Sequence, residues 1–349
     1  MKNFINLFLI SLLTFLFSSV LNGQEDENVE EVVVISSKIP VPLSEVVGSV
    51  TLITQDDLDA RVVSDLGDIL ENTVGVSVPR SSQYGRYYNE GISIRGLGGS
   101  RVNIFVDGVR VSDAYAGYGR DVVEVDLLKR VEILKGPTSA LYGSDGLAGA
   151  VSYVTKDASD FTDSGSHYTA RYSQFSDSNQ DKYSFLYAFV GERIDGILQF
   201  TDKESSEMEL HNDALLEPNP VMSEGKSLLG KLTVDVNEKL DMTLTLDNQE
   251  WSSDIIVNTD IGSTFYPGLS LLSTTSSSEG ADEGSRDRVS LKLNYAAQNN
   301  LFDSAILNIF SQSTDQQQIT NKVVADMVFG QFGPMGPPSP GLLFRDFQF

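Results

Sequence analysis

The chain has 349 residues, of which 25 are Lys or Arg and 49 are Asp or Glu, so its formal net charge is −24. This acidity argues against a nucleic-acid-binding protein, which needs a basic surface against phosphates. The sequence has no Cys and only two His, which excludes disulfide scaffolds, Cys-ligated metal sites and thiol nucleophiles and leaves little for a His-based triad or metal site.

The first 23 residues have the pattern of an export signal. Lys2 precedes an uncharged, mostly apolar run over residues 4–21, and small or polar residues then lead to the acidic residues 25–27. A membrane anchor helix is the alternative, but the run is at the short end for spanning a bilayer and only one basic residue precedes it. We therefore expect a secreted, periplasmic or outer-membrane protein, with cleavage near Gly23.

A short β-prone segment follows the acidic residues. It covers residues 30–38, has the apolar centre Val32-Val33-Val34-Ile35, and is bounded by Pro40 and Pro42, which resist a continuing helix or central strand. The residues alone allow two interpretations. The segment is either an edge strand of the next domain or a detachable strand that another protein captures by backbone pairing.

Residues 45–157 have the pattern of a compact α+β domain. One helix is expected to begin after Thr54, with acidic residues in its first turn, and a second after Ser64. A tight turn is expected at Asp107-Gly108, between two apolar runs. Strands are expected over residues 46–53, 76–78, 92–96, 102–106, 131–134 and 151–155.

Three motifs in this region resemble the plug domain of TonB-dependent outer-membrane receptors. They are IRGLGGSRV over residues 94–102, FVDGVR over residues 105–110, and LKRVEILKGPTSALYG over residues 128–143. The motifs occur in the family's order, and the resemblance extends over about residues 30–157.

The resemblance assigns roles to particular residues. It implies that the β-prone segment is the TonB box, with residues 35–37 departing from the family's frequent Thr-Ala. It also implies that basic residues of the plug, Arg95 and Lys135, pair with acidic residues of the barrel and lock the plug in place. The TonB-binding residues implied are Glu31, Val32, Val33, Val34, Ile35 and Ser36.

From about residue 166 the pattern changes to a period of two. Apolar and polar residues alternate over residues 242–247 and 289–295, as in strands with lipid on one face and water on the other, although a soluble β-sandwich gives the same alternation. Seven strands are expected, near residues 167–175, 182–191, 196–205, 226–236, 241–252, 287–297 and 304–315.

Connection lengths favour the membrane barrel. The connections after the second, fourth and sixth strands are short, whereas those over residues 206–225, 258–286 and from 320 onward are long. The connection after the first strand, residues 176–181, is a short exception. Long loops at one end and short turns at the other are typical of outer-membrane barrels. This arrangement predicts that His211, Tyr266 and residues 334–340 lie outside the cell.

The resulting fold class is an α+β plug followed by an antiparallel transmembrane β-barrel. Bacterial barrels have even strand numbers and the family resemblance implies 22 strands, so we expect the sequence to be the front part of a receptor. The expected divisions are a signal peptide (1–23), a TonB-box segment and linker (24–44), the plug (45–157) and the first part of the barrel (158–349).

The resemblance implies import without catalysis. The expected partners are TonB in the periplasm, outer-membrane lipid and a transported nutrient, and no resident cofactor or metal is expected. Parts of the plug look most like the haem and haemoglobin branch, so haem is the first expected cargo, with siderophores or cobalamin as alternatives. Candidate ligand-contacting residues are Tyr84, Tyr87, Tyr88, Tyr115, Tyr118 and His211.

Two other classes of protein remain open. One is a binding or signalling protein that keeps the plug but does not transport. The other is a secreted enzyme, suggested by Glu204, Glu207 and Glu209, although carboxylates spaced in this way on a loop are typical of a solvated surface.

Overall fold

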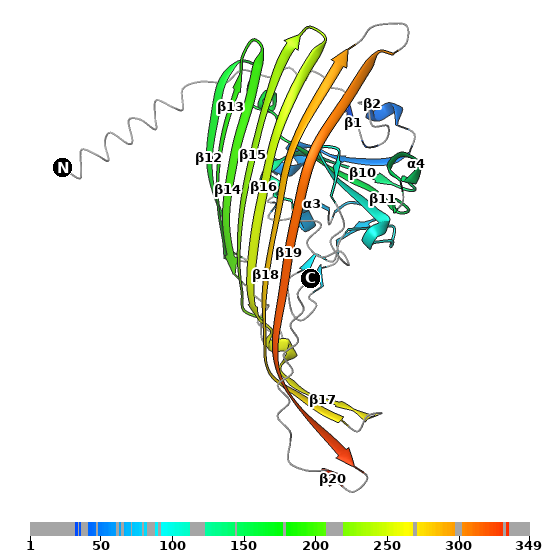
Figure 1. The fold of residues 1–349 in the computed structure, drawn as a ribbon, viewed down its shortest axis with the longest axis vertical. Coiled ribbons are helices and arrows are strands. Elements are labelled where there is room, and N and C mark those ends of the chain that lie inside the picture. Colours follow the sequence, from blue (N-terminus) through cyan, green and yellow to red (C-terminus); the bar gives the residue numbers. More distant parts are fainter. Residues whose placement is uncertain are drawn as a thin grey trace, which may run out of the picture.

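The protein consists of an N-terminal domain that lies against one face of a tall, curved antiparallel sheet, which we call the strand wall (Figure 1). The predicted signal peptide lies outside the residues that the structure describes. The computed structural model describes residues 32–33, 35, 41–46, 48–60, 63, 66–70, 72–78, 80–81, 88–89, 92–111, 123–143, 145–176, 179–206, 219–267, 271–296, 302–330 and 333–334.

A five-stranded sheet forms the centre of the N-terminal domain. Its order is β3-β10-β11-β8-β9, in which β11 pairs parallel to β8 and the other pairs are antiparallel. The strands are β3 (Ser49–Ile53), β8 (Val102–Val106), β9 (Val109–Arg110), β10 (Leu128–Lys135) and β11 (Gly149–Thr155). The predicted turn at Asp107-Gly108 joins β8 to β9, and both of its residues have positive φ, 50° and 79°. Asp and Gly are among the residues that tolerate this conformation best.

Helices cover the sheet, and apolar side chains fill the space between. α2 (Gln55–Ala60) begins after Thr54, whose hydroxyl accepts a hydrogen bond from the Asp57 backbone N–H while the Asp57 carboxylate accepts from the Thr54 N–H. α3 (Leu66–Leu70) buries Ile69 and Leu70 completely. The other helical segments are η1 (Leu43–Glu45), η3 (Gly99–Arg101), η5 (Val125–Leu127), α4 (Ser139–Tyr142) and η6 (Ala158–Asp160).

Three two-residue strand pairs complete this domain: β1 (Val32–Val33) with β2 (Val41–Pro42), β4 (Val76–Ser77) with β7 (Ser93–Ile94), and β5 (Arg80–Ser81) with β6 (Tyr88–Asn89). Within the described parts of the chain, no helix combines the length and the apolar character needed to cross a bilayer.

The strand wall contains seven long strands in sequence order, as the alternating pattern predicts. They are β12 (Gly165–Phe175), β13 (Gln180–Val190), β14 (Ile194–Ser206), β15 (Val221–Asn237), β16 (Leu240–Ile256), β18 (Leu271–Ala296) and β19 (Ser304–Gly330). The short strand β17 (Gly262–Tyr266) pairs with β18 and follows η7 (Asn258–Asp260), and β20 (Gly333–Pro334) pairs with β19.

The two faces of the wall differ in chemistry. The face turned away from the N-terminal domain carries exposed aromatic and aliphatic side chains, such as Tyr168, Phe185, Leu198, Leu246 and Ile309. The opposite face is largely polar and contacts the N-terminal domain. This is the alternation expected of a wall between lipid and an aqueous, plugged interior.

Two strands are longer than the sequence predicts. Residues 271–286 were expected to lie in a connection, but they form the first half of β18, and β19 continues past residue 315 to Gly330. The register from Leu271↔Val328 to Arg286↔Thr314 shows that the two extensions pair with each other. Their Ser, Gly and Asp residues do not alternate in hydropathy, so the sequence contains no strand signal here. These strands are extended by backbone hydrogen bonding between them.

The short connections after β13 and β15 lie at one end of the wall, as predicted, and β18 ends and β19 begins at that same end. β1 and β2 lie toward that same end, whereas β17 and β20 lie at the other end (Figure 1). The segment predicted to be the TonB box is therefore nearer to the short-turn end.

Candidate functional site

The predicted TonB box is attached to the N-terminal domain through Ile35. Val32 and Val33 form β1, and Ile35, which is 2% exposed, has both backbone polar groups occupied by side chains. Its N–H donates to Glu132 Oε2 at 2.8 Å, and its carbonyl accepts from the Tyr142 hydroxyl at 2.8 Å. The other three residues of the predicted box, Glu31, Val34 and Ser36, lie outside the described residues.

Glu132 and Tyr142 are themselves held in place by the domain. Glu132 lies on β10, is fully buried, and accepts a second hydrogen bond from Arg130 Nε at 2.8 Å. The Tyr142 ring, on α4, contacts the Phe105 ring at a centroid distance of 4.5 Å. Burial and the nearby Glu132 carboxylate raise the pKa of Tyr142 to about 12, so its hydroxyl keeps the proton that it donates to Ile35.

A seam of ion pairs joins the N-terminal domain to the strand wall. In its first cluster, Arg288 of β18 donates from Nη2 to Asp107 Oδ2 at 2.8 Å and from Nη1 to the Val106 carbonyl at 2.5 Å. Lys231 of β15 lies 2.9 Å from Asp157 Oδ1 and 3.9 Å from Asp107 Oδ1. Arg288 also reaches Asp247 of the wall at 3.0 Å.

The charges of the wall change the acidity of these carboxyl groups. Burial alone would raise the pKa of Asp107, but the Lys231 and Arg288 cations and two hydrogen bonds from Thr155 hold it well below its ordinary value. Lys231 and Lys129 lower the pKa of Asp157 against the same opposing effect of burial. Both groups are therefore anionic at neutral pH.

The second cluster of the seam surrounds η5. Lys182 of β13 lies 3.0 Å from Asp126 Oδ1 and 3.9 Å from Glu124 Oε1, and Lys203 of β14 donates to Glu124 Oε2 at 2.7 Å. The two lysines outweigh the effect of burial and lower the pKa of Glu124. Gly225 leaves space for the Lys203 stem, because a Cβ at that position would lie 2.7 Å from Lys203 Cε.

Two glutamines add neutral hydrogen bonds to this cluster. Gln199 donates from its amide to the Asp126 carbonyl at 2.8 Å, and Gln249 Oε1 accepts from the Glu124 N–H at 3.0 Å. Chemically, the seam binds a folded domain to a wall through charge-assisted hydrogen bonds that require no covalent change to break.

In the ion pairs that cross this seam, the acids belong to the N-terminal domain and the bases to the wall, opposite to the polarity that the sequence resemblance implied. The two expected lock residues lie elsewhere. Arg95 is exposed, with φ of 53°, and Lys135 donates from Nζ to the Val74 carbonyl at 2.7 Å. Burial and the neighbouring Arg95 cation lower the pKa of Lys135. Their pairing with barrel carboxylates stays a prediction.

Sequence reasoning missed the seam residues because partners such as Arg288 and Asp107 are 181 positions apart. One signal was present in the sequence. Each cation that the wall contributes to the seam lies on the polar face of an alternating strand, where an uncharged polar residue would be enough for contact with water. These cations are Lys182, Lys203, Lys231 and Arg288.

Five of the six candidate ligand residues lie outside the part of the chain that the structure describes. Tyr84, Tyr87, Tyr115, Tyr118 and His211 lie outside the described residues, and Tyr88 is described only as backbone in β6. The other histidine, His167, lies with a ring nitrogen 2.8 Å from Thr169 Oγ1 and stacks on Phe161. The described residues contain no group of three or more His, Asp or Glu side chains that could hold a metal ion.

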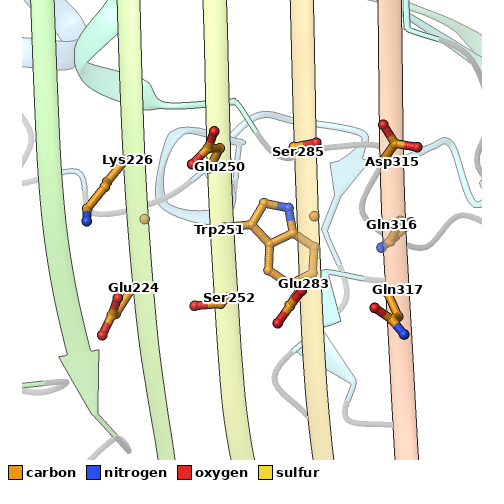
Figure 2. Close-up of a pocket in the computed structure, with 12 residues that line it drawn as sticks. Glu224, Lys226, Glu250, Trp251, Ser252, Glu283, Ser285, Asp315, Gln316 and Gln317 are labelled. Carbon is orange, nitrogen blue, oxygen red and sulfur yellow. The ribbon is translucent and has the colours of Figure 1, made fainter.

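One cavity borders the seam, and another lies on the wall. One, of about 1020 Å³, lies between the N-terminal domain and the wall and is lined by Ile35, Tyr142, Asp157 and Lys231, among others. The other, of about 540 Å³, lies on the wall at the level of Trp251, where four strands contribute the residues drawn in Figure 2. The Trp251 indole lies close to Gly284, whose missing side chain leaves it room.

Comparison with known proteins gives matches to both parts of the chain. Residues 42–150 match the model of the TonB-dependent Receptor Plug Domain. The chain is 35% identical over 154 residues to the vitamin B12 transporter BtuB of Vibrio vulnificus (strain CMCP6). The aligned region covers 44% of this chain and 25% of that protein.

Solved structures match over most of the chain. The alcaligin outer-membrane receptor FauA from Bordetella pertussis gives a TM-score of 0.52 at 15% identity, covering 86% of this chain and 55% of that one. FpvA from P. aeruginosa, bound to a heterologous pyoverdine, gives 0.51 at 12% identity, covering 89% and 48%. These likenesses show the fold, and the chain spans about half of each of these structures and a quarter of the curated relative.

Proposed function

We propose that this chain forms part of an energy-coupled importer and that TonB binds it at the β1 segment. The N-terminal domain is a plug domain of the TonB-dependent receptor type. The antiparallel wall that the plug contacts is a partial barrel, and the chain is located in the outer membrane of a Gram-negative bacterium. The proposed partners are TonB, outer-membrane lipid along the apolar face of the wall, and a transported nutrient.

One observation carries the TonB assignment. At Ile35 the predicted box is held by two side-chain hydrogen bonds, and at Val32 and Val33 by a two-residue strand pair. Attachments this small can be exchanged for backbone pairing with another protein, which is how a β-augmenting partner binds. The segment also lies toward the short-turn end of the wall, which is the periplasmic end in this class of barrel.

For the cargo, we propose a cobalamin or ferric-siderophore type of metal chelate. The named relatives are a vitamin B12 transporter, an alcaligin receptor and a receptor bound to a pyoverdine. Haem, the cargo first expected from the sequence, has less support, because the plug has no His to ligate haem iron. Catalysis is not part of the proposal, since the curated relative is a transporter.

Uptake measurements test both parts of this proposal. Val33→Pro removes a backbone donor and should abolish uptake of the cargo while leaving its binding to whole cells unchanged, whereas Val33→Ala, which keeps the N–H, should retain uptake. Normal uptake by the Val33→Pro variant would contradict the TonB assignment.

The cargo is tested with a deletion of the gene. Cells without it should lose uptake of radiolabelled cobalamin or of a ferric siderophore and should grow normally on haemoglobin as the iron source. A defect confined to haemoglobin would overturn the cargo proposal in favour of haem.

A further inference from the structure

Ile35 is the point at which the box segment enters the buried part of the plug. Its side chain packs in a small apolar cluster with Phe105, Leu134 and Ala150, apart from the main core. Its N–H and carbonyl both bind side chains of the plug, Glu132 and Tyr142, at 2.8 Å each. The residue is therefore restrained by packing and by polar contacts at both its N–H and its carbonyl.

These contacts compete with capture by a partner strand. A protein that binds an extended segment by β-augmentation needs the backbone N–H and carbonyl groups of that segment. In this structure those of Ile35 are already occupied, and β1 is paired with β2 in the register Val32↔Pro42 and Val33↔Val41. The box must leave both arrangements before it can pair over its whole length.

We propose that Glu132 and Tyr142 are positioning residues that keep the box docked on the plug and so limit its capture by TonB when no cargo is bound. This inference rests on the proposed function and adds to it the two side chains that set the availability of the box. They act through the backbone of Ile35 and do not touch the cargo.

The chemistry of the two residues suits this role. The Glu132 carboxylate uses one oxygen for Arg130 Nε and the other for the Ile35 N–H, so a carboxylate satisfies two donors at once. A glutamine has only one acceptor oxygen, and its amide group would face one of those donors. Tyr142 keeps its ring on Phe105 independently of its hydroxyl, so the hydroxyl can be removed without removing the packing.

The cavity beside the box gives the segment a way out. Ile35 and Tyr142 both line the space of about 1020 Å³ between the plug and the wall. Release of Ile35 therefore needs no rearrangement of the main core of the plug, which lies around Ile104, Val131 and Val151.

The test measures how accessible the box is in the full-length receptor in outer-membrane vesicles, without TonB or cargo. The reporter is Val33→Cys, and the chain as given has no Cys to compete with it. We expect a maleimide to label the reporter about three- to tenfold faster with Tyr142→Phe or Glu132→Gln, the range that corresponds to losing one hydrogen bond. Binding of the purified periplasmic domain of TonB to the cargo-free receptor without the reporter should tighten by a similar factor.

A second tyrosine provides the matched control. Tyr172 donates its hydroxyl to Asp181 on the outward face of the wall, so Tyr172→Phe makes the same chemical change away from the box and should label at the parent rate. Cargo affinity should be equal in all these receptors, which separates release of the box from misfolding.

Labelling at the parent rate in both the Tyr142→Phe and Glu132→Gln receptors would overturn the inference. That result would leave the TonB assignment intact, provided that Val33→Pro still abolishes uptake. If Val33→Pro leaves uptake unchanged, the proposed function fails by a separate measurement.

Discussion

The guanidinium group of Arg288 and the carboxylate of Asp107 lie 2.8 Å apart and join the strand wall to the plug across 181 positions of sequence. Arg288 is fully buried and divides its donors among Asp107, Asp247 and the Val106 carbonyl. A planar guanidinium spreads its donors over three nitrogens in a fixed fork, whereas an ammonium group carries all its donors on one nitrogen.

Arg288→Lys is therefore expected to destabilise the folded chain although it keeps the charge. The three donors of an ammonium group sit on a single nitrogen, which cannot reach acceptors now contacted by two separate guanidinium nitrogens, so at least one of these oxygens loses its partner, and we expect a loss of about 2–4 kcal/mol in the free energy of unfolding. Chemical denaturation in detergent micelles measures it. Lys292→Arg, on the same face of β18, is the control and should change stability by less than about 0.5 kcal/mol.

Acid should weaken the seam. The pKa values of Asp107, Glu124 and Asp157 are all lowered in the folded protein, so each contributes stability above its ordinary pKa and loses it as the pH falls below about 4. We expect Asp107→Asn to cost about 2 kcal/mol at pH 7 and progressively less toward pH 2, because below about pH 4 the Asp107 carboxylate of the unfolded wild-type chain takes up a proton that the folded chain does not, which removes part of the wild-type advantage.

Thermal unfolding of both proteins between pH 2 and pH 7 tests this expectation. The exposed Asp163 is the control position, and Asp163→Asn should follow the wild-type profile. A constant difference between Asp107→Asn and wild type across the whole range would mean that the charge of Asp107 is not what stabilises the seam.

The contact between Trp251 and Gly284 gives a prediction with an optical signal. A Cβ added at Gly284 would lie 2.4 Å from Trp251 Nε1, so Gly284→Ala should displace the indole and destabilise the wall by about 1–3 kcal/mol. Trp251 is the one Trp in this sequence, so tryptophan fluorescence reports on this side chain alone, and its emission maximum should shift in the Gly284→Ala variant. Gly230→Ala, whose added Cβ would come no closer than 3.8 Å to Leu198, should leave the emission unchanged.

Much of the fold can be read from local patterns. The order of elements in the plug, the cap at Thr54, the turn at Asp107-Gly108 and the seven long strands all follow from short-range signals in the sequence. The extension of β18 over residues 271–286 does not, because Ser, Gly and Asp residues have no alternation and only pairing with β19 makes them a strand.

The site was harder to predict than the fold. Resemblance to a family pointed to the box, but no local pattern connects Ile35 to Glu132, which is 97 positions away. The same limit applies to the seam, where the resemblance suggested basic residues on the plug and the described contacts use acidic ones. Contacts of this kind depend on which residues the fold brings together, and each partner by itself has the pattern of an ordinary surface charge.

The polarity of the seam also bears on how the two parts come together during biogenesis. At physiological ionic strength, unlike charges attract one another over about 8 Å, a longer reach than that of hydrogen bonds or packing. Because the acids lie on one part and the bases on the other, the approaching plug is turned toward its final orientation before the surfaces touch. An insertion that presented Arg95 and Lys135 to Lys182 and Lys203 would instead meet repulsion, so the arrangement that holds the assembled pair also selects against a reversed one.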